Sequence, residues 1–255
     1  MGAMSVTANA ISHDAFGPIL DGLIRVKFNS FEDCKRAIES NADVSAVLLE
    51  PVQGEGGIVP CDKEYLQKIR DICTKNNILL MIDEVQSGFC RTGRWFSYQH
   101  SGVVPDVVMV AKALGNGVPI GACLAKGDAA HVLVAGMHGS TFGGNFLSTA
   151  VGLKILDIMR DNQLCQHVSK ISKIMSDYMT KKIQPLSNVQ DIRICGMMIG
   201  IELKKPCTDL VIKALDKGLV MNVTKEKVIR LLPPLICQEK DVLTVSSTHL
   251  RAHET

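Results

Sequence analysis

Three side chains that could take part in chemistry, Glu50, Asp83 and Lys112, stand at or just beyond the ends of short apolar runs. Apolar runs of this length are typical of buried strands in a parallel sheet. In such a sheet, ligands bind beyond the carboxyl ends of the strands. A solvated strand end is the ordinary alternative for any one of these residues. The three together indicate a binding site that holds two acids and an amine.

Asp83 and Lys112 together suggest one kind of chemistry. Asp83 follows five apolar residues, so its carboxylate needs a cationic partner, such as a protonated heteroaromatic nitrogen. Lys112 lies between Val110–Ala111 and Ala113–Leu114, and an apolar setting makes a lysine a nucleophile that can form a Schiff base. Pyridoxal phosphate (PLP) chemistry uses both groups. A surface lysine whose stem covers apolar residues is the alternative for Lys112.

The elements that must position these groups are predicted to be strand, helix and strand. A helix is expected from Asp62, a suitable N-cap, to about Asn76, because apolar residues recur there at spacings of three and four. A helix between two short strands forms a βαβ unit, so the sheet is expected to be parallel. The predicted strands are Ser45–Glu50, Ile78–Ile82, Pro105–Val110 and Ile120–Ala125.

The second half of the chain changes character near Asp161, where two long predicted helices give way to shorter alternating pieces. We therefore expect a large domain over residues 1–160 and a smaller C-terminal α+β domain over residues 161–245. Residues 246–255 are polar and are expected to be a disordered or foreign tail. The predicted elements are helices at Asn145–Met159, Gln163–Lys181 and Asp209–Lys217, and strands at Met198–Leu203, Leu219–Val223 and Val228–Leu232.

Three segments are rich in glycine: Gln53–Gly57, Leu114–Gly121 and Gly139–Asn145. None matches a P-loop or a dinucleotide fingerprint, which argues against a dinucleotide-dependent dehydrogenase. Ser140 and Thr141 are the best candidates for binding a phosphate, because they precede a predicted helix and helix starts attract anions. A plain turn is the alternative for this segment.

The bulk composition is that of a globular protein. Of 255 residues, 46% are hydrophobic and 21% charged, and the net charge is +2 with scattered basic residues. Neither a nucleic acid nor a membrane surface is expected as a partner. The nine cysteines form no C-x-x-C pair, so we expect reduced thiols and no metal site. The start of the chain lacks the features of a signal peptide, and a cytoplasmic location is expected.

Five stretches are similar to the class-III, or ornithine-type, PLP-dependent aminotransferases, and within them to the acetylornithine aminotransferases. Their order and spacing fit over roughly residues 5–245. The most specific feature is Ile-Asp-Glu-Val-Gln followed about 29 residues later by Ala-Lys-Ala-Leu-Gly. The stretches are Glu50–Gly57 (EPVQGEGG), Ile82–Gly93 (IDEVQSGFCRTG), Pro105–Gly121 (PDVVMVAKALGNGVPIG), Gly139–Asn145 (GSTFGGN) and Ile229–Leu235 (IRLLPPL).

The resemblance implies roles around the cofactor. Asp83 would pair with the pyridine nitrogen of PLP. Val85 would pack on the face of the ring, and Gln86 would bond the ring's phenolic oxygen. Lys112 would be the Schiff-base lysine and, once released, would carry the proton between the substrate and the cofactor.

The resemblance also implies roles around the substrate and a partner subunit. Ser140 and Thr141 resemble the pair that reaches the cofactor phosphate of the neighbouring subunit, which implies a homodimer with shared active sites. Glu55 resembles a gate glutamate that pairs with an active-site arginine. Arg230 looks like that arginine, which binds the α-carboxylate of the substrate. A guanidinium suits this task because it grips a carboxylate with two hydrogen bonds.

The implied fold is a fold-type I PLP-dependent transferase, an α/β protein with a parallel-rich sheet in the large domain. Members of the family are longer at the N-terminus, so we expect an N-terminally truncated chain. Its large domain would be incomplete and would expose apolar surface.

The implied reaction moves the δ-amino group of N-acetylornithine to 2-oxoglutarate. It gives N-acetylglutamate semialdehyde and glutamate, as in arginine biosynthesis. Ornithine or 4-aminobutyrate as the amino donor are near alternatives, and an inactive truncated fragment is another.

Overall fold

The computed structural model describes residues 2–7 and 17–242, so the predicted tail over residues 246–255 lies outside the described residues. The chain divides into two compact units, Met1–Ser45 and Ala46–Thr255, and each is described by itself. In the part of the chain that the structure describes, no helix combines the length and the apolar character needed to cross a membrane.

The first unit contains helices α1 (Gly2–Val6) and α3 (Phe31–Glu39). Ser30 caps α3, because its hydroxyl accepts a hydrogen bond from the backbone N–H of Asp33 at 3.4 Å. A serine at this position satisfies one of the unpaired N–H groups at a helix start. Glu32 in the first turn also complements the positive end of the helix dipole.

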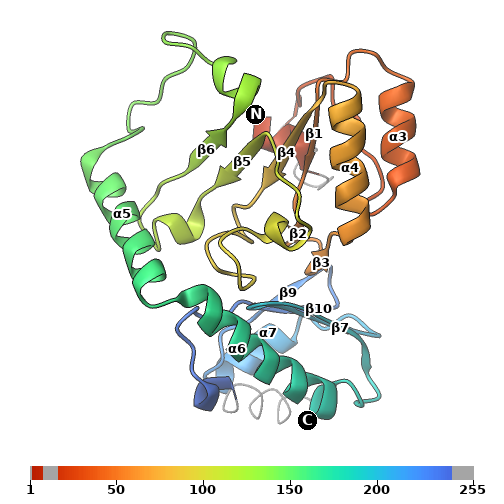
Figure 1. Cartoon of the computed structure of the whole chain (residues 1–255). Coiled ribbons are helices and arrows are strands. Elements are labelled where there is room, and N and C mark those ends of the chain that lie inside the picture. The colour runs from red at the N-terminus through yellow and green to blue at the C-terminus, as the bar shows by residue number, and fades with distance from the viewer. Residues whose placement is uncertain (1, 8–16, 243–255) are drawn as a thin grey trace. The chain divides into compact units, whose positions relative to one another are not determined.

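The second unit contains the predicted parallel sheet. Its strands lie in the order β1–β4–β5–β6, and β1, β4 and β5 are parallel (Figure 1). Strand β6 runs antiparallel to β5, which the sequence did not reveal. The connection between these two strands is too short for the helical crossover that a parallel pair requires. The strands lie where they were predicted, at β1 (Ala46–Leu49), β4 (Leu79–Asp83), β5 (Val107–Val110) and β6 (Ala122–Ala125).

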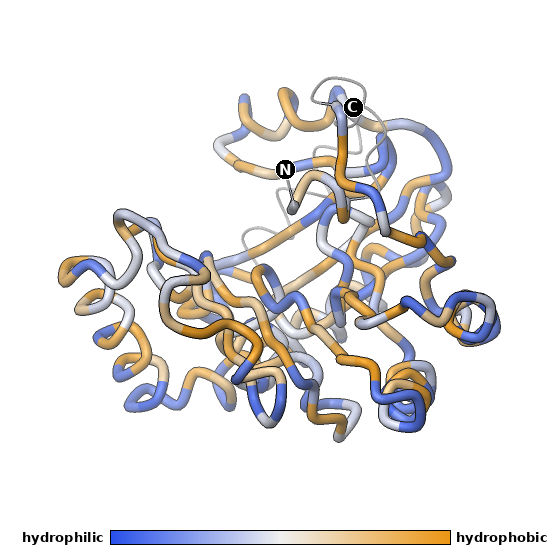
Figure 2. Tube along the Cα trace, turned by 90° about the horizontal axis from the view of Figure 1, so that it is seen from above, coloured by the Kyte–Doolittle hydropathy of each residue, from blue (hydrophilic) through white to orange (hydrophobic). Residues whose placement is uncertain are grey.

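Helix α4 (Lys63–Lys75) connects β1 and β4 as predicted and packs against β4. Figure 2 shows that apolar and polar stretches follow one another closely along the trace of the whole chain. On β4, Leu80 and Ile82 are fully buried, whereas the alternate residues, including Asp83, are half-buried. Strand β4 therefore has one fully buried face and one partly exposed face, and Asp83 lies on the partly exposed face. The buried residues of α4 are Tyr65, Leu66, Ile69, Ile72 and Cys73.

The C-terminal part of the second unit forms a separate antiparallel sheet in the order β7–β8–β10–β9. Strand β7 was not predicted, because its outward residues are polar and a register shift between Val189 and Asp191 breaks its alternation. Strand β9 begins later than predicted. The division of the chain into a large and a small domain near Asp161 stays a prediction. The elements here are α6 (Leu164–Tyr178), β7 (Val189–Cys195), β8 (Met198–Leu203), α7 (Leu210–Asp216), β9 (Asn222–Thr224) and β10 (Val228–Leu231).

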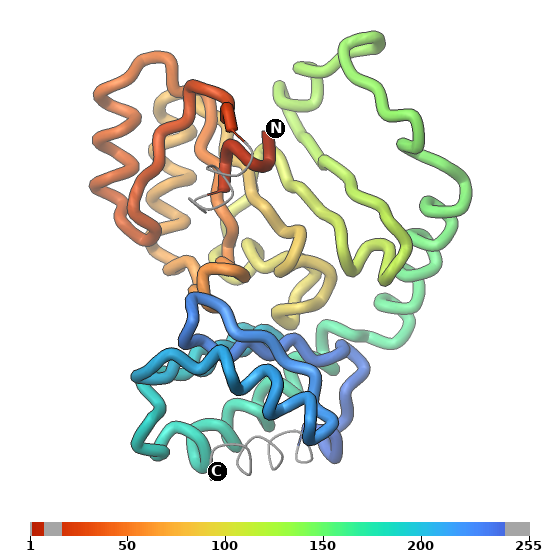
Figure 3. The backbone as a smooth tube through the Cα atoms, turned by 180° about the vertical axis from the view of Figure 1, so that it is seen from behind, coloured from red at the N-terminus to blue at the C-terminus, as the bar shows by residue number. Residues whose placement is uncertain are grey.

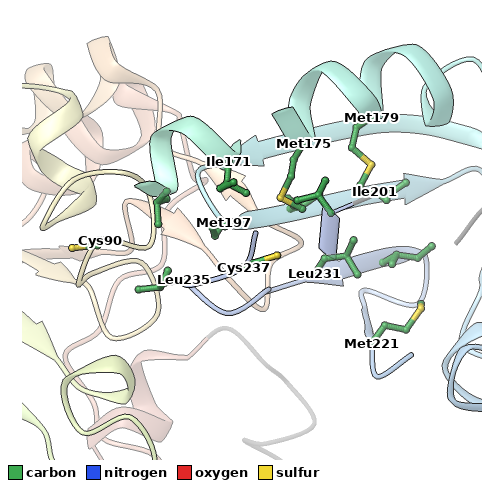
Figure 4. Close-up of a cluster of buried hydrophobic side chains, with 14 of the residues drawn as sticks. Cys90, Ile171, Met175, Met179, Met197, Ile201, Met221, Leu231, Leu235 and Cys237 are labelled. Carbon is green, nitrogen blue, oxygen red and sulfur yellow. The ribbon is translucent and has the colours of Figure 1, made fainter. Parts of the chain in front are cut away.

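A methionine-rich core fills the space between α6 and this sheet (Figure 4). Met175 and Met179 come from α6 and the turn that follows it, and Met197 precedes β8. All three are nearly or fully buried. Unbranched, polarisable methionine side chains suit such an irregular space between a helix and a twisted sheet.

Helix α5 (Phe146–Asp161) follows β6 through the long connection over residues 127–145, drawn in green in Figure 3. Asn145 caps α5, because its Oδ1 accepts a hydrogen bond from Ser148 N at 2.9 Å. The connection and the start of α5 expose large apolar side chains. These exposed residues are Val132, Leu133, Val134, Met137, Phe142, Phe146 and Leu147.

Candidate active site

The structure brings the three strand-end groups to one edge of the parallel sheet. Glu50 directly follows the last residue of β1, and Asp83 is the last residue of β4. Asp83 pairs with Met109 of β5, which lies shortly before Lys112. The charges of Asp83 and Lys112 both shift the pKa of Glu50. The three side chains therefore share one electrostatic environment at the carboxyl ends of neighbouring strands.

The pKa of Glu50 reflects both its burial and the charges around it. Burial raises the pKa of Glu50, and the nearby charges of Asp83 and Glu55 raise it further. A hydrogen bond from Gly54 N to Glu50 Oε2 at 3.1 Å and the charge of Lys112 lower it, without reversing the change. At Glu50 the neighbouring carboxyl groups and burial therefore outweigh the amine of Lys112, and a cationic group of a ligand would be stabilised beside Glu50 and Asp83.

Lys112 has a backbone conformation that residues other than glycine rarely adopt, with φ at 43°. It opens a short 3₁₀ helix, Lys112–Leu114, just after β5. Its carbonyl accepts hydrogen bonds from Gly115 N at 3.1 Å and Asn116 N at 3.0 Å. The left-handed region costs about 1 kcal/mol for an ordinary residue. The turn thus fixes the position of the lysine at a cost in stability, as is common at functional sites.

Gln86 contributes a buried polar atom without a partner. Its Oε1 is buried and has no hydrogen bond within the described part of the chain. A Cβ at Gly54 would come within 2.0 Å of this atom, so any side chain at position 54 would push the Gln86 amide aside. Because an unpaired buried amide is costly, Gln86 fits a bound group that brings its own polar atoms.

Asp83 and Val85 also fit a planar cofactor. Asp83 Oδ1 accepts a hydrogen bond from Val85 N at 2.9 Å, and among the described residues no hydrogen bond reaches the other carboxylate oxygen. Val85 is half-buried in the turn after β4. An acid, an apolar side chain and an amide with an unpaired oxygen thus follow one another in the turn after β4, a set that suits a planar aromatic group with a charged nitrogen.

Glu84 fixes the turn that carries Gln86, although its place in the sequence does not mark it as a site residue. Its fully buried side chain accepts hydrogen bonds from Ser87 Oγ at 2.6 Å and Tyr98 N at 2.9 Å. Its own N–H donates to Met109 O at 2.9 Å. Burial raises the pKa of Glu84, and these hydrogen bonds oppose the rise. In the sequence it looks like any acid beside a strand, because its partners lie elsewhere.

Arg230 pairs with Glu55, as the resemblance implies. Arg230 Nη1 lies 2.5 Å from Glu55 Oε1, and Arg230 Nε donates to Asn222 Oδ1 at 3.1 Å. The Arg230 side chain is 11% exposed and that of Glu55 is 76% exposed. The arginine is therefore held within its sheet, whereas the glutamate sits on a loop between β2 (Val52–Gln53) and β3 (Val59–Pro60) and can move into solvent.

Arg193 anchors the Glu55 loop, a role that the sequence did not reveal. Its Nε and Nη2 donate to the carbonyl of Gly57 at 3.1 and 3.0 Å. Its Nη1 contacts Asp191 at 2.7 Å and Glu202 at 2.8 Å. These contacts tie the glycine-rich loop to β7 and β8, and so help to keep Glu55 within reach of its arginine.

Ser140 and Thr141 are not part of this group. Both are exposed in the turn before α5, where Gly143 N donates to Ser140 O at 3.1 Å. Within the described ranges, no hydrogen bond or ion pair joins them to the other candidate residues. Their exposure agrees with both predictions for this segment, a plain turn and a contact to a neighbouring subunit.

Comparison with known sequences identifies the family to which the chain belongs. The chain matches the family described as aminotransferase class-III over residues 1–248. It is 45% identical to an acetylornithine aminotransferase of Nitrosomonas europaea over 241 residues, which cover 94% of this chain and 61% of the relative. It is 42% identical to one from Clostridium acetobutylicum, covering 92% and 60%. The chain thus spans about three-fifths of the length of these curated relatives.

Solved structures give the same result for the fold. An ornithine aminotransferase of Toxoplasma gondii superposes with a TM-score of 0.93 at 30% identity, covering 99% of this chain and 62% of that one. An acetylornithine aminotransferase of Elizabethkingia anophelis gives 0.85 at 31% identity, covering 91% and 59%. A further Toxoplasma gondii structure has PLP at partial occupancy in its active site. The predicted fold-type I architecture is confirmed.

Proposed function

The chain belongs to the class-III aminotransferases, and from that premise we propose that it is the catalytic part of an N-acetylornithine aminotransferase. The enzyme would move the δ-amino group of N-acetylornithine to 2-oxoglutarate, giving N-acetylglutamate semialdehyde and glutamate in arginine biosynthesis. The cofactor of the family is PLP. The observation that carries the proposal is the convergence of Asp83, Lys112 and the unpaired amide of Gln86 at one sheet edge.

PLP, when bound, withdraws electrons from the substrate carbon that bears the amino group. Asp83 would keep the pyridine nitrogen protonated, with the carboxylate oxygen that Val85 N leaves available. Gln86 would donate to the ring's phenolic oxygen through its Nε2 group, its Oε1 would accept from another group of the ligand, and Val85 would pack on the ring face. The amine of Lys112 would bind the cofactor covalently and, once displaced by the donor, would take the proton from the substrate carbon.

Arg230 would bind the α-carboxylate of the substrate, and Glu55 would control access to it. The close pair between them and the high exposure of Glu55 support this proposal. An incoming carboxylate can replace the glutamate without leaving the arginine unpaired. Arg230 would therefore keep a negative partner in every state, which limits the cost of its burial.

Ornithine and 4-aminobutyrate remain the alternative donors. The similarity to ornithine aminotransferase structures supports the first of them. The more similar curated sequences, which carry the acetylornithine name, support N-acetylornithine. An inactive fragment is the alternative from another class, because the chain spans only part of its relatives' length.

We further propose a cytoplasmic homodimer in which Ser140 and Thr141 of one subunit reach the cofactor phosphate of the other. Their exposure supports this arrangement. The large domain would comprise residues 1–160 and the small domain residues 161–245.

Borohydride reduction in the presence of PLP tests the proposal. The chain is incubated with PLP, reduced and digested with trypsin. A phosphopyridoxyl group is expected on Lys112, within an uncleaved peptide over residues 95–126. Lys112→Ala should lose the adduct, and the control Lys126→Ala, which alters a lysine beside β6, should keep the adduct on Lys112. Labelling spread over surface lysines, together with strong binding of an apolar dye, would favour the inactive fragment.

A further inference from the structure

Two cysteines far apart in the sequence place their sulfur atoms next to each other. Cys90 Sγ and Cys165 Sγ are 3.0 Å apart, and the residues are separated by 75 positions. Both are free cysteines of the second unit. Cys90 lies in the loop that follows the candidate cofactor residues, and Cys165 lies in the first turn of α6. Cys90 belongs to the core cluster that α6 covers, and Figure 4 shows it at the margin of that cluster.

Tight packing on both sides holds these sulfur atoms together. Gly93 has φ at 86°, and a Cβ there would come within 2.5 Å of Ser169 Oγ on α6. The same hydroxyl donates to Cys165 O at 2.9 Å. Arg91 Nη1 donates to Pro233 O at 2.5 Å, which fixes the loop from the other side. The loop and the helix are therefore in contact around the pair, and the contact does not depend on one flexible side chain.

We propose that Cys90 and Cys165 form a redox-sensitive dithiol, which a hydroperoxide converts into an intramolecular disulfide. A disulfide needs a sulfur–sulfur separation of about 2 Å, so closing this pair requires the two sulfur atoms to approach by about 1 Å. The pair lies outside the residues assigned to the cofactor and the substrate, so this inference does not depend on the proposed function.

The chemistry runs in two steps. Cys165 is half-buried and Cys90 is fully buried, so the oxidant meets Cys165 first. Its sulfur takes one oxygen atom from the hydroperoxide and becomes a sulfenic acid, while the hydroperoxide leaves as water or an alcohol. The sulfur of Cys90 then attacks the sulfur of Cys165, and the hydroxyl leaves with the thiol proton as water.

Burial explains why Cys90 would not react alone. Burial raises the pKa of the Cys90 thiol, and its contact with Cys165 raises it further. A protonated and enclosed thiol is a poor nucleophile toward solvent oxidants. It becomes reactive only toward a partner sulfur that is already in contact with it.

Peptide mapping of the full chain tests the proposal. The reduced chain is treated with a small excess of hydrogen peroxide, blocked with iodoacetamide and digested with trypsin. The expected product joins the peptide over residues 76–91 to that over residues 161–170, with a mass two hydrogens below their sum. It should disappear after treatment with dithiothreitol. The midpoint of thermal unfolding should rise on oxidation and fall back on reduction, because a cross-link restricts the unfolded chain.

Two variants control the experiment. Cys165→Ser should abolish both the linked peptide and the thermal shift. Cys123→Ser, which changes an exposed cysteine on β6, should leave both in place. Oxidation of Cys165 to higher acids without a linked peptide would overturn the proposal, and so would a link to any other cysteine in the wild-type chain.

Discussion

Gln86 has a buried amide oxygen without a hydrogen-bond partner among the described residues, and this predicts two opposite effects of Gln86→Leu. Leucine removes the unpaired atom, so the chain without cofactor should keep its stability or gain about 1 kcal/mol. The same change removes a bond to PLP, so the Kd for PLP should rise about tenfold. Thermal unfolding without PLP and an absorbance titration with PLP measure the two effects separately.

Gly54 provides the matched comparison for this prediction. A methyl group there would come within 2.0 Å of the Gln86 amide, so Gly54→Ala should displace the amide and weaken PLP binding to a similar degree. The double variant should lose less affinity than the two single losses added together. Gly152→Ala is the control, because its new methyl group meets only ordinary contacts at 3.6 Å. Unchanged PLP affinity in Gln86→Leu would remove Gln86 from the cofactor site.

At the scale of single residues, the sequence reveals a site residue when its local setting is unusual. Asp83 and Lys112 could be selected because each interrupts apolar surroundings. Glu84 and Arg193 could not, because their roles depend on distant partners. The backbone N–H that Glu84 binds is 14 residues away, and the carbonyl that Arg193 binds is 136 residues away. Such long-range hydrogen bonds leave no periodicity in the chain.

At the scale of elements, the strands of the parallel sheet and helix α4 were predictable because burial gives them continuous apolar runs or regular spacing. Strand β7 was not predicted, because polar and apolar residues alternate only irregularly around its register shift. The antiparallel direction of β6 was not predicted either, because a strand's own residues do not encode the direction of its neighbour. The missing information in both cases belongs to pairs of elements.

The ion pairs of Glu202, on β8, with Arg193 and Lys227 are expected to weaken at low pH. Hydrogen bonds from Lys227 and Arg193 lower the pKa of Glu202, whose side chain is 17% exposed. A carboxyl pKa that is lower in the folded state adds stability above the unfolded pKa, about 4.3. This stability is lost as the pH falls through the folded pKa. The free energy of unfolding in urea should therefore drop below about pH 4.3.

Glu202→Gln isolates this contribution. At pH 7 the variant should be less stable by about 1 kcal/mol, because a partly buried ion pair is lost. The difference from wild type should shrink as the pH falls, since the wild-type carboxylate becomes protonated as well. Glu64→Gln, an exposed change in the first turn of α4, should show no such convergence. A constant difference across the pH range would mean that Glu202 acts through packing alone.

At the scale of the whole molecule, the chain combines a group of candidate cofactor residues at one sheet edge with an exposed apolar surface. It spans about three-fifths of its curated relatives, and the connection before α5 exposes a group of large apolar side chains. Exposed apolar groups of this kind mark places where protein surfaces meet. The proposed contact of Ser140 and Thr141 with a neighbouring subunit falls in the same connection.

This surface predicts that the chain self-associates and that two phenylalanines carry much of the effect. Phe142 is 82% exposed and Phe146 is 94% exposed. If both are buried on association, replacing them with aspartate should weaken it about 100-fold or more, since each buried ring contributes about 1.5–3 kcal/mol. Sedimentation velocity over a range of concentrations measures the change. Ile212→Asp, on α7 and 67% exposed, is the control for adding charge to an apolar position. Equal association in all variants would show that the subunit contact lies elsewhere and would leave the partner role of Ser140 and Thr141 without support.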